Sequence, residues 1–201
     1  MNTININFNE KLEKILRFIV EIDKVKQIFR KTKLFDAGRF ENDSEHSWTV
    51  CIMALLLKEY ADYSVDIAKV VVMLLIHDIV EIDAGDTFLY SEKRNDVHAD
   101  EEKAAERIFG LLDDDKRDYF LNTWREFEER KTNEAKFAAV FDRFEPLLQN
   151  YLTEGYTWKN NNIKYDMVLE KNKHIREASA EIWELIKVML DDAVEKGYLD
   201  K

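Results

Sequence analysis

The stretch Val70–Ile76 reads Val-Val-Val-Met-Leu-Leu-Ile and places the strongest limit on the fold. It lies in the middle of residues 66–82, whose spacing predicts a helix. A helix that is apolar on all sides has no face for water, so other elements must surround it. The run is far shorter than the roughly 20 residues that a helix needs to cross a bilayer. The sequence therefore predicts a buried central helix and no membrane segment.

Apolar residues recur at helical spacing along most of the remaining chain. We expect further helices at about 12–32, 44–60, 98–112, 116–130, 134–151 and 174–195, with loops at 33–43 and 158–162. Five glycines and one proline fit helices joined by short connections better than a turn-rich β-fold. No Pro/Gly/Ser-rich linker divides the chain, so we expect a single all-α domain over residues 1–201.

The net charge and the cysteine content limit which partners and which cell compartment fit this chain. The formal net charge of −11 argues against a nucleic-acid polymer as partner, because such binding depends on Lys and Arg at backbone phosphates. A small phosphorylated substrate is compatible, since a metal ion and one or two basic side chains supply positive charge locally. The N-terminus lacks the regions of a signal peptide, and the lone Cys51 cannot form an internal disulfide. We expect a cytoplasmic protein.

Two histidines and two aspartates form the most informative chemical pattern. His46 lies where the second helix should begin, His77 and Asp78 are adjacent after the apolar run, and Asp142 lies among aromatic residues. Imidazole nitrogens and carboxylate oxygens together suit a borderline divalent metal. Four such ligands on a six-coordinate ion leave positions for water and substrate. The pattern therefore predicts a metal-dependent hydrolase.

The order His, His-Asp, Asp on successive helices resembles the HD-domain phosphohydrolase superfamily. Three stretches are similar to the branch that contains the bacterial and human 5'-deoxynucleotidases: Glu41–Ser47, His77–Asp86 and Glu134–Asp142. The resemblance covers about residues 10–150, with a helical extension over about 163–201. It implies a single HD-domain helical bundle.

The resemblance also implies that one divalent ion is held by the four residues of the pattern, His46, His77, Asp78 and Asp142. HD proteins with two-metal centres carry two further histidines between the His-Asp pair and the final Asp, and here only His98 falls there. A single ion is therefore expected. Ligands of this kind accept Mn, Co, Zn, Fe, Ni or Mg, so the metal stays open.

Glu81 and Asp86 are the candidate catalytic residues. Glu81 is four residues after His77 and three after Asp78, so the three side chains share one sector of a helix. Similarity to the nucleotidase branch implies that Glu81 positions or deprotonates the attacking water, or protonates the leaving oxygen. Asp86 would assist at the sugar or the leaving group.

The same branch implies a basic phosphate anchor near the end of the first helix. The candidates are Arg30, Lys31 and Arg39, and ungapped counting from Ser-Glu-His points to Lys31. Enzymes of this branch best known for deoxyribose preference have a tryptophan immediately after the anchor, where this chain has Thr32. Selectivity for deoxyribose is therefore not implied.

Other aromatic and imidazole residues have simpler interpretations. His98 and His174 lie in charged surroundings, so we expect them to face solvent. Trp48, Trp124 and Trp183 recur at helical spacing from apolar residues, so we expect them in the core.

The sequence thus predicts a phosphomonoesterase that acts on a small phosphorylated substrate, a nucleoside 5'-monophosphate. Two alternatives stay open at this point. One is an HD phosphohydrolase for another phosphate or pyrophosphate ester, and the other is a helical metal-binding regulatory domain without turnover. The extra carboxylates beside the metal pattern favour catalysis, because a structural site fills its coordination sphere with protein ligands. The branch contains dimers, so a homodimer is expected.

Overall fold

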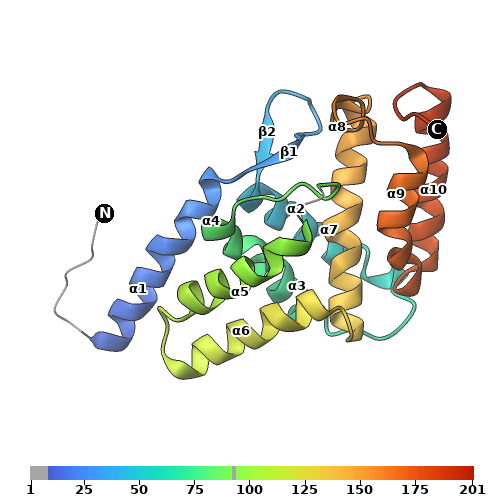
Figure 1. Cartoon of the computed structure of the whole chain (residues 1–201). Helices are drawn as coiled ribbons and strands as arrows, with labels where there is room; N and C mark the ends of the chain where they lie inside the picture. The colour runs from blue at the N-terminus through green and yellow to red at the C-terminus, as the bar shows by residue number, and fades with distance from the viewer. Residues whose placement is uncertain (1–8, 92–93) are drawn as a thin grey trace.

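The computed structural model describes residues 9–91 and 94–201, and helices dominate it (Figure 1). The elements in chain order, with η for a 3-10 helix, are α1 (Glu10–Ile22), η1 (Asp23–Gln27), β1 (Phe29–Lys33), β2 (Phe40–Asn42), α2 (Asp43–Leu56), η2 (Lys58–Tyr60), α3 (Ile67–Ile76), η3 (His77–Val80), α4 (Glu81–Ala84), α5 (Arg94–Phe109), α6 (Asp114–Glu129), α7 (Asn133–Leu152), α8 (Tyr156–Asn160), α9 (Tyr165–Asn172), η4 (Lys173–Glu177) and α10 (Ala180–Glu195). The all-α prediction is confirmed, and the described residues add to it one small antiparallel sheet of β1 and β2.

The apolar stretch forms most of α3 and is central, as predicted. Val70, Met73 and Leu74 are fully buried in a core that α2, α7 and α10 share. Ile76 and Ile79 belong to a second apolar cluster, which α1, α5 and α6 complete. The C-terminal end of α3 therefore lies where the two clusters meet.

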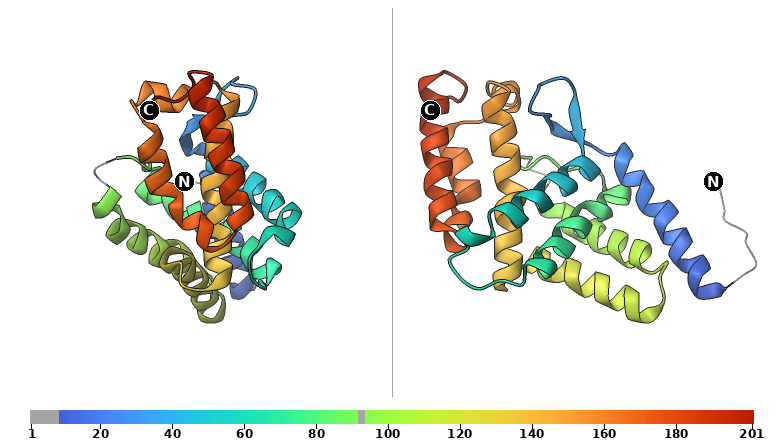
Figure 2. Two further views of the ribbon diagram at one scale, coloured as in Figure 1. Left: turned by 90° about the vertical axis from the view of Figure 1, so that its right-hand side faces the viewer. Right: turned by 180° about the vertical axis from the view of Figure 1, so that it is seen from behind.

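The C-terminal region differs from the prediction in three places. Residues 156–160 form α8, which overlaps the loop expected at 158–162, and α9 was not predicted. The last helix begins at Ala180, because the Ser179 side chain caps it by accepting from the backbone N–H of Ile182. Helices α7, α9 and α10 lie side by side at one end of the molecule, and α1 lies at the opposite end (Figures 1 and 2).

The first helix is shorter than predicted, because the chain leaves α1 at Ile22 and turns into a β-hairpin. Ile28 is extended, and the strand at 29–33 pairs antiparallel with 40–42. Pairing within this hairpin thus overrides a sequence pattern that continues as a helix to Phe29. Helix α2 then begins at Asp43 with a capping box between Asn42 and Glu45, one residue before the expected start of this helix.

The predicted helix over 66–82 also breaks, and the break lies at the His-Asp pair. The carbonyl oxygen of Leu74 accepts from the His77 ring at 2.8 Å, and the carbonyl oxygen of His77 accepts from Trp124 Nε1 at 3.2 Å. Side chains thus donate to two backbone carbonyls at the place where α3 gives way to the tighter η3. Gly85, with φ of 74°, then ends α4 in a conformation that glycine adopts without strain.

Trp124 and Trp183 are buried as predicted, but Trp48 is not. Its side chain is 66% exposed on the outer face of α2. The prediction failed because an apolar spacing does not say whether a neighbouring element covers that face. Among the described residues, no helix combines the length and apolarity needed to cross a bilayer.

Candidate metal centre

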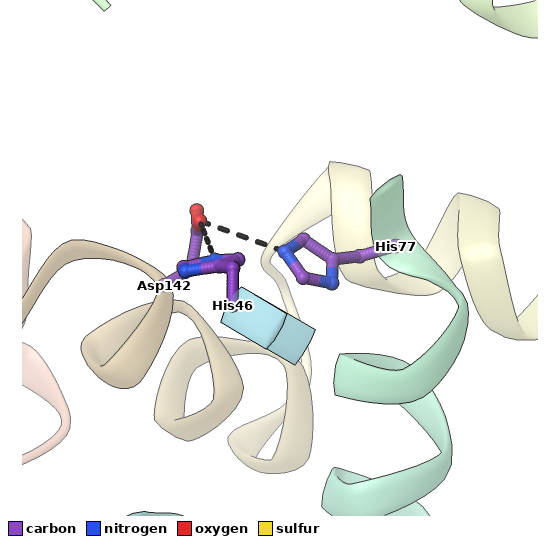
Figure 3. Close-up of side chains that lie close together, drawn as sticks. All are labelled: His46, His77 and Asp142. Atoms are coloured by element: carbon purple, nitrogen blue, oxygen red, sulfur yellow. Dashed lines mark ion pairs between the residues drawn. The ribbon is translucent and has the colours of Figure 1, made fainter. Parts of the chain in front are cut away.

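Three residues from distant parts of the chain converge on one point (Figure 3). His46 comes from the first turn of α2, His77 from η3 and Asp142 from the middle of α7. Asp142 Oδ1 lies 3.4 Å from His46 Nε2 and 3.6 Å from His77 Nε2. All three side chains are buried, and their possible ligand atoms lie within 4.8 Å of one another.

Hydrogen bonds on the far side of each imidazole set its tautomer. His46 Nδ1 lies 3.1 Å from Glu145 Oε2, and His77 Nδ1 lies 2.8 Å from the Leu74 carbonyl oxygen. Carboxylates and carbonyls only accept, so each Nδ1 carries the hydrogen. Both Nε2 atoms are then left buried without a hydrogen-bond partner and face the centre. This is the arrangement that orients histidines toward a metal ion.

Asp78 borders the same point and is a fourth candidate ligand. Its Oδ1 lies 3.2 Å from His77 Nε2, and its Oδ2 lies 3.9 Å from His46 Nε2. Arg30 Nη1 donates to the same Oδ2 at 2.7 Å and so orients the carboxylate. Two imidazole nitrogens and two carboxylates fit a borderline divalent ion.

The electric field at this point favours positive charge. Burial and Arg30 lower the pKa of His46, but Asp142 and Glu145 outweigh them and raise it to about 10. Burial raises the pKa of Asp142, yet Arg143 and the two imidazoles hold it well below its usual range. Without a metal, protons therefore occupy the place that a cation would take.

A second group of buried carboxylates surrounds the centre and was not predicted from the sequence. Burial and Glu145 raise the pKa of Glu41 to about 7, and burial and Asp78 raise that of Asp43 to about 7. Arg30 lies among them, with Nη1 3.6 Å from Asp43 Oδ1. Glu41 and Asp43 stand in the same stretch as His46, and Glu145 follows Asp142 by three residues, so helical spacing could have indicated Glu145.

A cavity opens beside the centre and brings most of the candidates together. The predicted site residues that line it are Arg30, Lys31, His77, Asp78, Glu81, Asp86 and Asp142. Phe88 and Tyr90 form an aromatic part of its wall. Burial and Asp78 raise the pKa of Glu81 well above its usual range, and burial raises that of Asp86. The structure does not bring Arg39 to the cavity, because its side chain is exposed and pairs with Glu45.

Several further lining residues were not predicted as site residues, among them Arg130, Arg143, Trp158 and Asn172. The first two lie next to segments already singled out, but Trp158 and Asn172 belong to the C-terminal extension. Only the tertiary fold, which packs this extension on α7, could reveal them.

The two remaining histidines behave differently from each other. His98 is exposed as predicted, although it also lines the cavity and lies near Glu101 and Glu128. His174 is half-buried, so the expectation that it faces solvent is wrong. Burial, Arg130 and Arg143 lower the pKa of His174 to about 4, so it is neutral at pH 7.

Curated relatives match most of the chain. The human protein named 5'-deoxynucleotidase HDDC2 is 27% identical over 164 residues, which cover 80% of this chain and 79% of that protein. The protein of the same name from Dictyostelium discoideum is 31% identical over 118 residues, or 55% of this chain and 62% of its own length.

Solved structures agree with these relatives. A predicted metal-dependent phosphohydrolase from Magnetospirillum magnetotacticum MS-1 has a TM-score of 0.92 and 46% identity, covering 96% of this chain and 97% of its own. The PH0347 protein from Pyrococcus horikoshii OT3 has a TM-score of 0.61 at 20% identity over 90% of this chain and 99% of its own, which supports the fold alone. A family model described as HD domain matches residues 22–183. The resemblance seen in the sequence is confirmed, and the chain belongs to the HD-domain family.

Proposed function

We propose that the protein is a metal-dependent phosphohydrolase that converts a nucleoside 5'-monophosphate to nucleoside and phosphate. The observation that carries the proposal is the convergence of His46, His77 and Asp142 beside a cavity that also contains Glu81 and Asp86. A structural metal site has no need of these two extra carboxylates. The names of the human relative and of the Magnetospirillum structure support the same reaction class.

The metal would be one divalent ion held by the four residues His46, His77, Asp78 and Asp142. When bound, such an ion lowers the pKa of a coordinated water and offsets the charge of the phosphate. This ligand set accepts Mn, Co, Zn, Fe, Ni or Mg. Elemental analysis of the purified protein identifies the ion.

Lys31 is the best candidate for the phosphate anchor. Its neighbour Arg30 already donates to Asp78 and lies close to Asp43, so Arg30 holds the metal ligand in place. Lys31 also lines the cavity, whereas Arg30 lies within 4.0 Å of a further carboxylate, that of Glu41. Thr157 fixes the strand here, because its Oγ1 donates to the Lys31 carbonyl oxygen at 2.9 Å. We therefore assign the phosphate contact to Lys31 and a positioning role to Arg30.

Glu81 would move the proton in the reaction, and Asp86 would contact the sugar. Glu81 follows the ligands His77 and Asp78 by one turn and lines the same cavity, with Oε2 buried and without a hydrogen-bond partner. A carboxyl group in this position can orient or deprotonate the attacking water, or protonate the leaving 5'-oxygen. Asp86 lies beyond Gly85, at the start of the segment that carries Phe88.

A phosphate-release assay with several added metals tests the proposal. We expect turnover of 5'-mononucleotides, poor turnover of the 3' isomers, and little difference between ribo and deoxyribo forms because Thr32 follows Lys31. Equal release from 5' and 3' isomers, or release only from other esters, would favour the alternative HD phosphohydrolase. No release with any metal while the metal is bound would favour a regulatory domain.

Three other expectations remain proposals. We propose one domain over residues 1–201 and a cytoplasmic location. We also propose a homodimer, and the exposed apolar residues Trp48, Ile52 and Leu55 on one face of α2 make this helix the surface to test. Light scattering of the wild type and of Trp48→Glu tests the dimer, since a charge there should produce a monomer.

A further inference from the structure

The wall of the cavity contributed by Arg130 and Asn172 has no role in the chemistry described above. Arg130 ends α6, and Asn172 ends α9 in the C-terminal extension. Both line the same cavity as His77 and Asp142. This wall therefore faces substrate without belonging to the metal centre.

Arg130 is held in an unfavourable backbone conformation for a long side chain. Its φ of 51° lies in the left-handed region, where glycine or asparagine usually ends a helix. A non-glycine residue in this region suggests a role for its side chain. Its Nε is buried without a hydrogen-bond partner among the described residues. Arg130 thus brings an unsatisfied donor to the cavity.

Asn172 brings an unsatisfied acceptor to the same wall. It is 1% exposed, and its Nδ2 donates to the Val168 carbonyl oxygen at 2.8 Å. This bond orients the amide, and Oδ1 is left buried with no hydrogen-bond partner in the described structure. An unpaired buried acceptor costs free energy unless a ligand supplies a donor.

Arg130 and Asn172 line one cavity although they come from different helices. The charge of Arg130 also lowers the pKa of His174, which follows Asn172 by two residues. Phe88 and Tyr90 also line the cavity, with ring centroids 5.4 Å apart. A planar ring that reaches this wall would meet aromatic surface as well as a guanidinium and an amide oxygen.

We propose that Arg130 and Asn172 form a base-reading subsite that prefers lactam bases, in which a ring N–H stands beside a carbonyl oxygen. Hypoxanthine, guanine, uracil and thymine have this pattern. The guanidinium would donate to the carbonyl oxygen, and Asn172 Oδ1 would accept from the ring N–H. Adenine and cytosine carry an amino group in place of the carbonyl oxygen and an unprotonated ring nitrogen in place of the ring N–H. Their amino group would then face the Arg130 guanidinium, which is also a donor. The inference rests on the proposed nucleotidase function.

Matched pairs of substrates test the subsite. Inosine and adenosine 5'-monophosphates differ only at this edge of a purine, and uridine and cytidine 5'-monophosphates differ only at this edge of a pyrimidine. We expect kcat/KM to favour the lactam member of each pair about tenfold or more, the size of one correct base pairing by a side chain. A preference in one pair alone assigns the subsite to purines or to pyrimidines.

Variants at Arg130 distinguish hydrogen bonding to the base from a general effect of the positive charge on binding of the nucleotide. Arg130→Gln should bring the ratio of kcat/KM values within each substrate pair close to one, mainly by raising KM for the lactam substrates. Arg130→Lys should not restore the ratios, because an ammonium lacks the planar pair of donors. Arg176→Gln, on an exposed side chain of η4 outside the cavity, is the matched control. Equal loss for all substrates in Arg130→Gln, or full rescue by lysine, would overturn the proposal in favour of a simple anion site.

Binding of the product nucleosides keeps this inference separate from the proposed function. Calorimetry with inosine and adenosine needs no turnover. If no nucleotide is hydrolysed but inosine binds about tenfold more tightly than adenosine, the proposed function fails and the subsite stands. If nucleotides are hydrolysed and the two nucleosides bind equally, or neither binds, the subsite is wrong.

Discussion

The hydrogen bond between Glu145 and His46 should control metal affinity without contributing a ligand. Glu145 is fully buried, and its Oε2 lies 3.1 Å from His46 Nδ1. The carboxylate fixes the tautomer of the ring and makes Nε2 a stronger base. Glu145→Gln keeps the shape of the side chain but removes its charge.

Loss of such an outer partner typically costs tenfold to a hundredfold in metal affinity, or about 1.4 to 2.7 kcal/mol. The lower end of this range applies here, because Glu41 Oε2 lies 3.8 Å from the same Nδ1 and can partly replace the missing carboxylate. We therefore expect the dissociation constant to rise about tenfold to thirtyfold.

Competition with a chelating indicator measures this affinity in the wild type and in Glu145→Gln. The control is Glu181→Gln, which makes the same change of charge on an exposed side chain of α10. The melting temperature of the metal-free variant should be unchanged or higher, because Glu145 raises the pKa of the buried Glu41 by repulsion. An unchanged metal affinity, or a loss explained by unfolding, would refute the reasoning.

Three further predictions follow from the same geometry. Glu81→Gln should keep the metal and lower turnover roughly a hundredfold or more, as measured by elemental analysis and phosphate release; near-normal turnover would rule out its proton-transfer role. Lys31→Gln should raise KM for nucleotides with metal content unchanged, and an unchanged KM would return the anchor to Arg30. The pKa of His174 is about 4 when folded and close to 6.5 when unfolded, so the unfolded chain takes up the proton first and stability falls as the pH drops from 6.5 toward 4. Urea unfolding at pH 7 and at pH 5 measures this effect. After discounting for partial exposure, the free energy of unfolding should fall by about 1 kcal/mol more in the wild type than in His174→Asn. Equal decreases in the two proteins would contradict the assignment.

The sequence predicted those parts of the fold that depend on local periodicity. The run Val70–Ile76 indicated a central helix, and the metal pattern named all three residues that converge, His46, His77 and Asp142. Such features are visible because apolar spacing and ligand chemistry are properties of short segments.

The missed features depend on contacts between distant segments. Glu145 meets His46 across 99 positions of the chain. His174 was expected in solvent, yet the fold half-buries it, and Arg130 from another helix lowers its pKa. Periodicity carries no information about which partner covers a given face, so these contacts required the structure.

The most direct test of the account is the metal content of the purified protein together with phosphate release from a 5'-mononucleotide. The wild type should hold about one divalent ion per chain, and His77→Ala and Asp142→Ala should each lose the ion and the activity. His98→Ala, which removes an exposed imidazole at the same cavity, should keep both. Metal content that is unchanged in His77→Ala and Asp142→Ala would contradict the proposed ligand set.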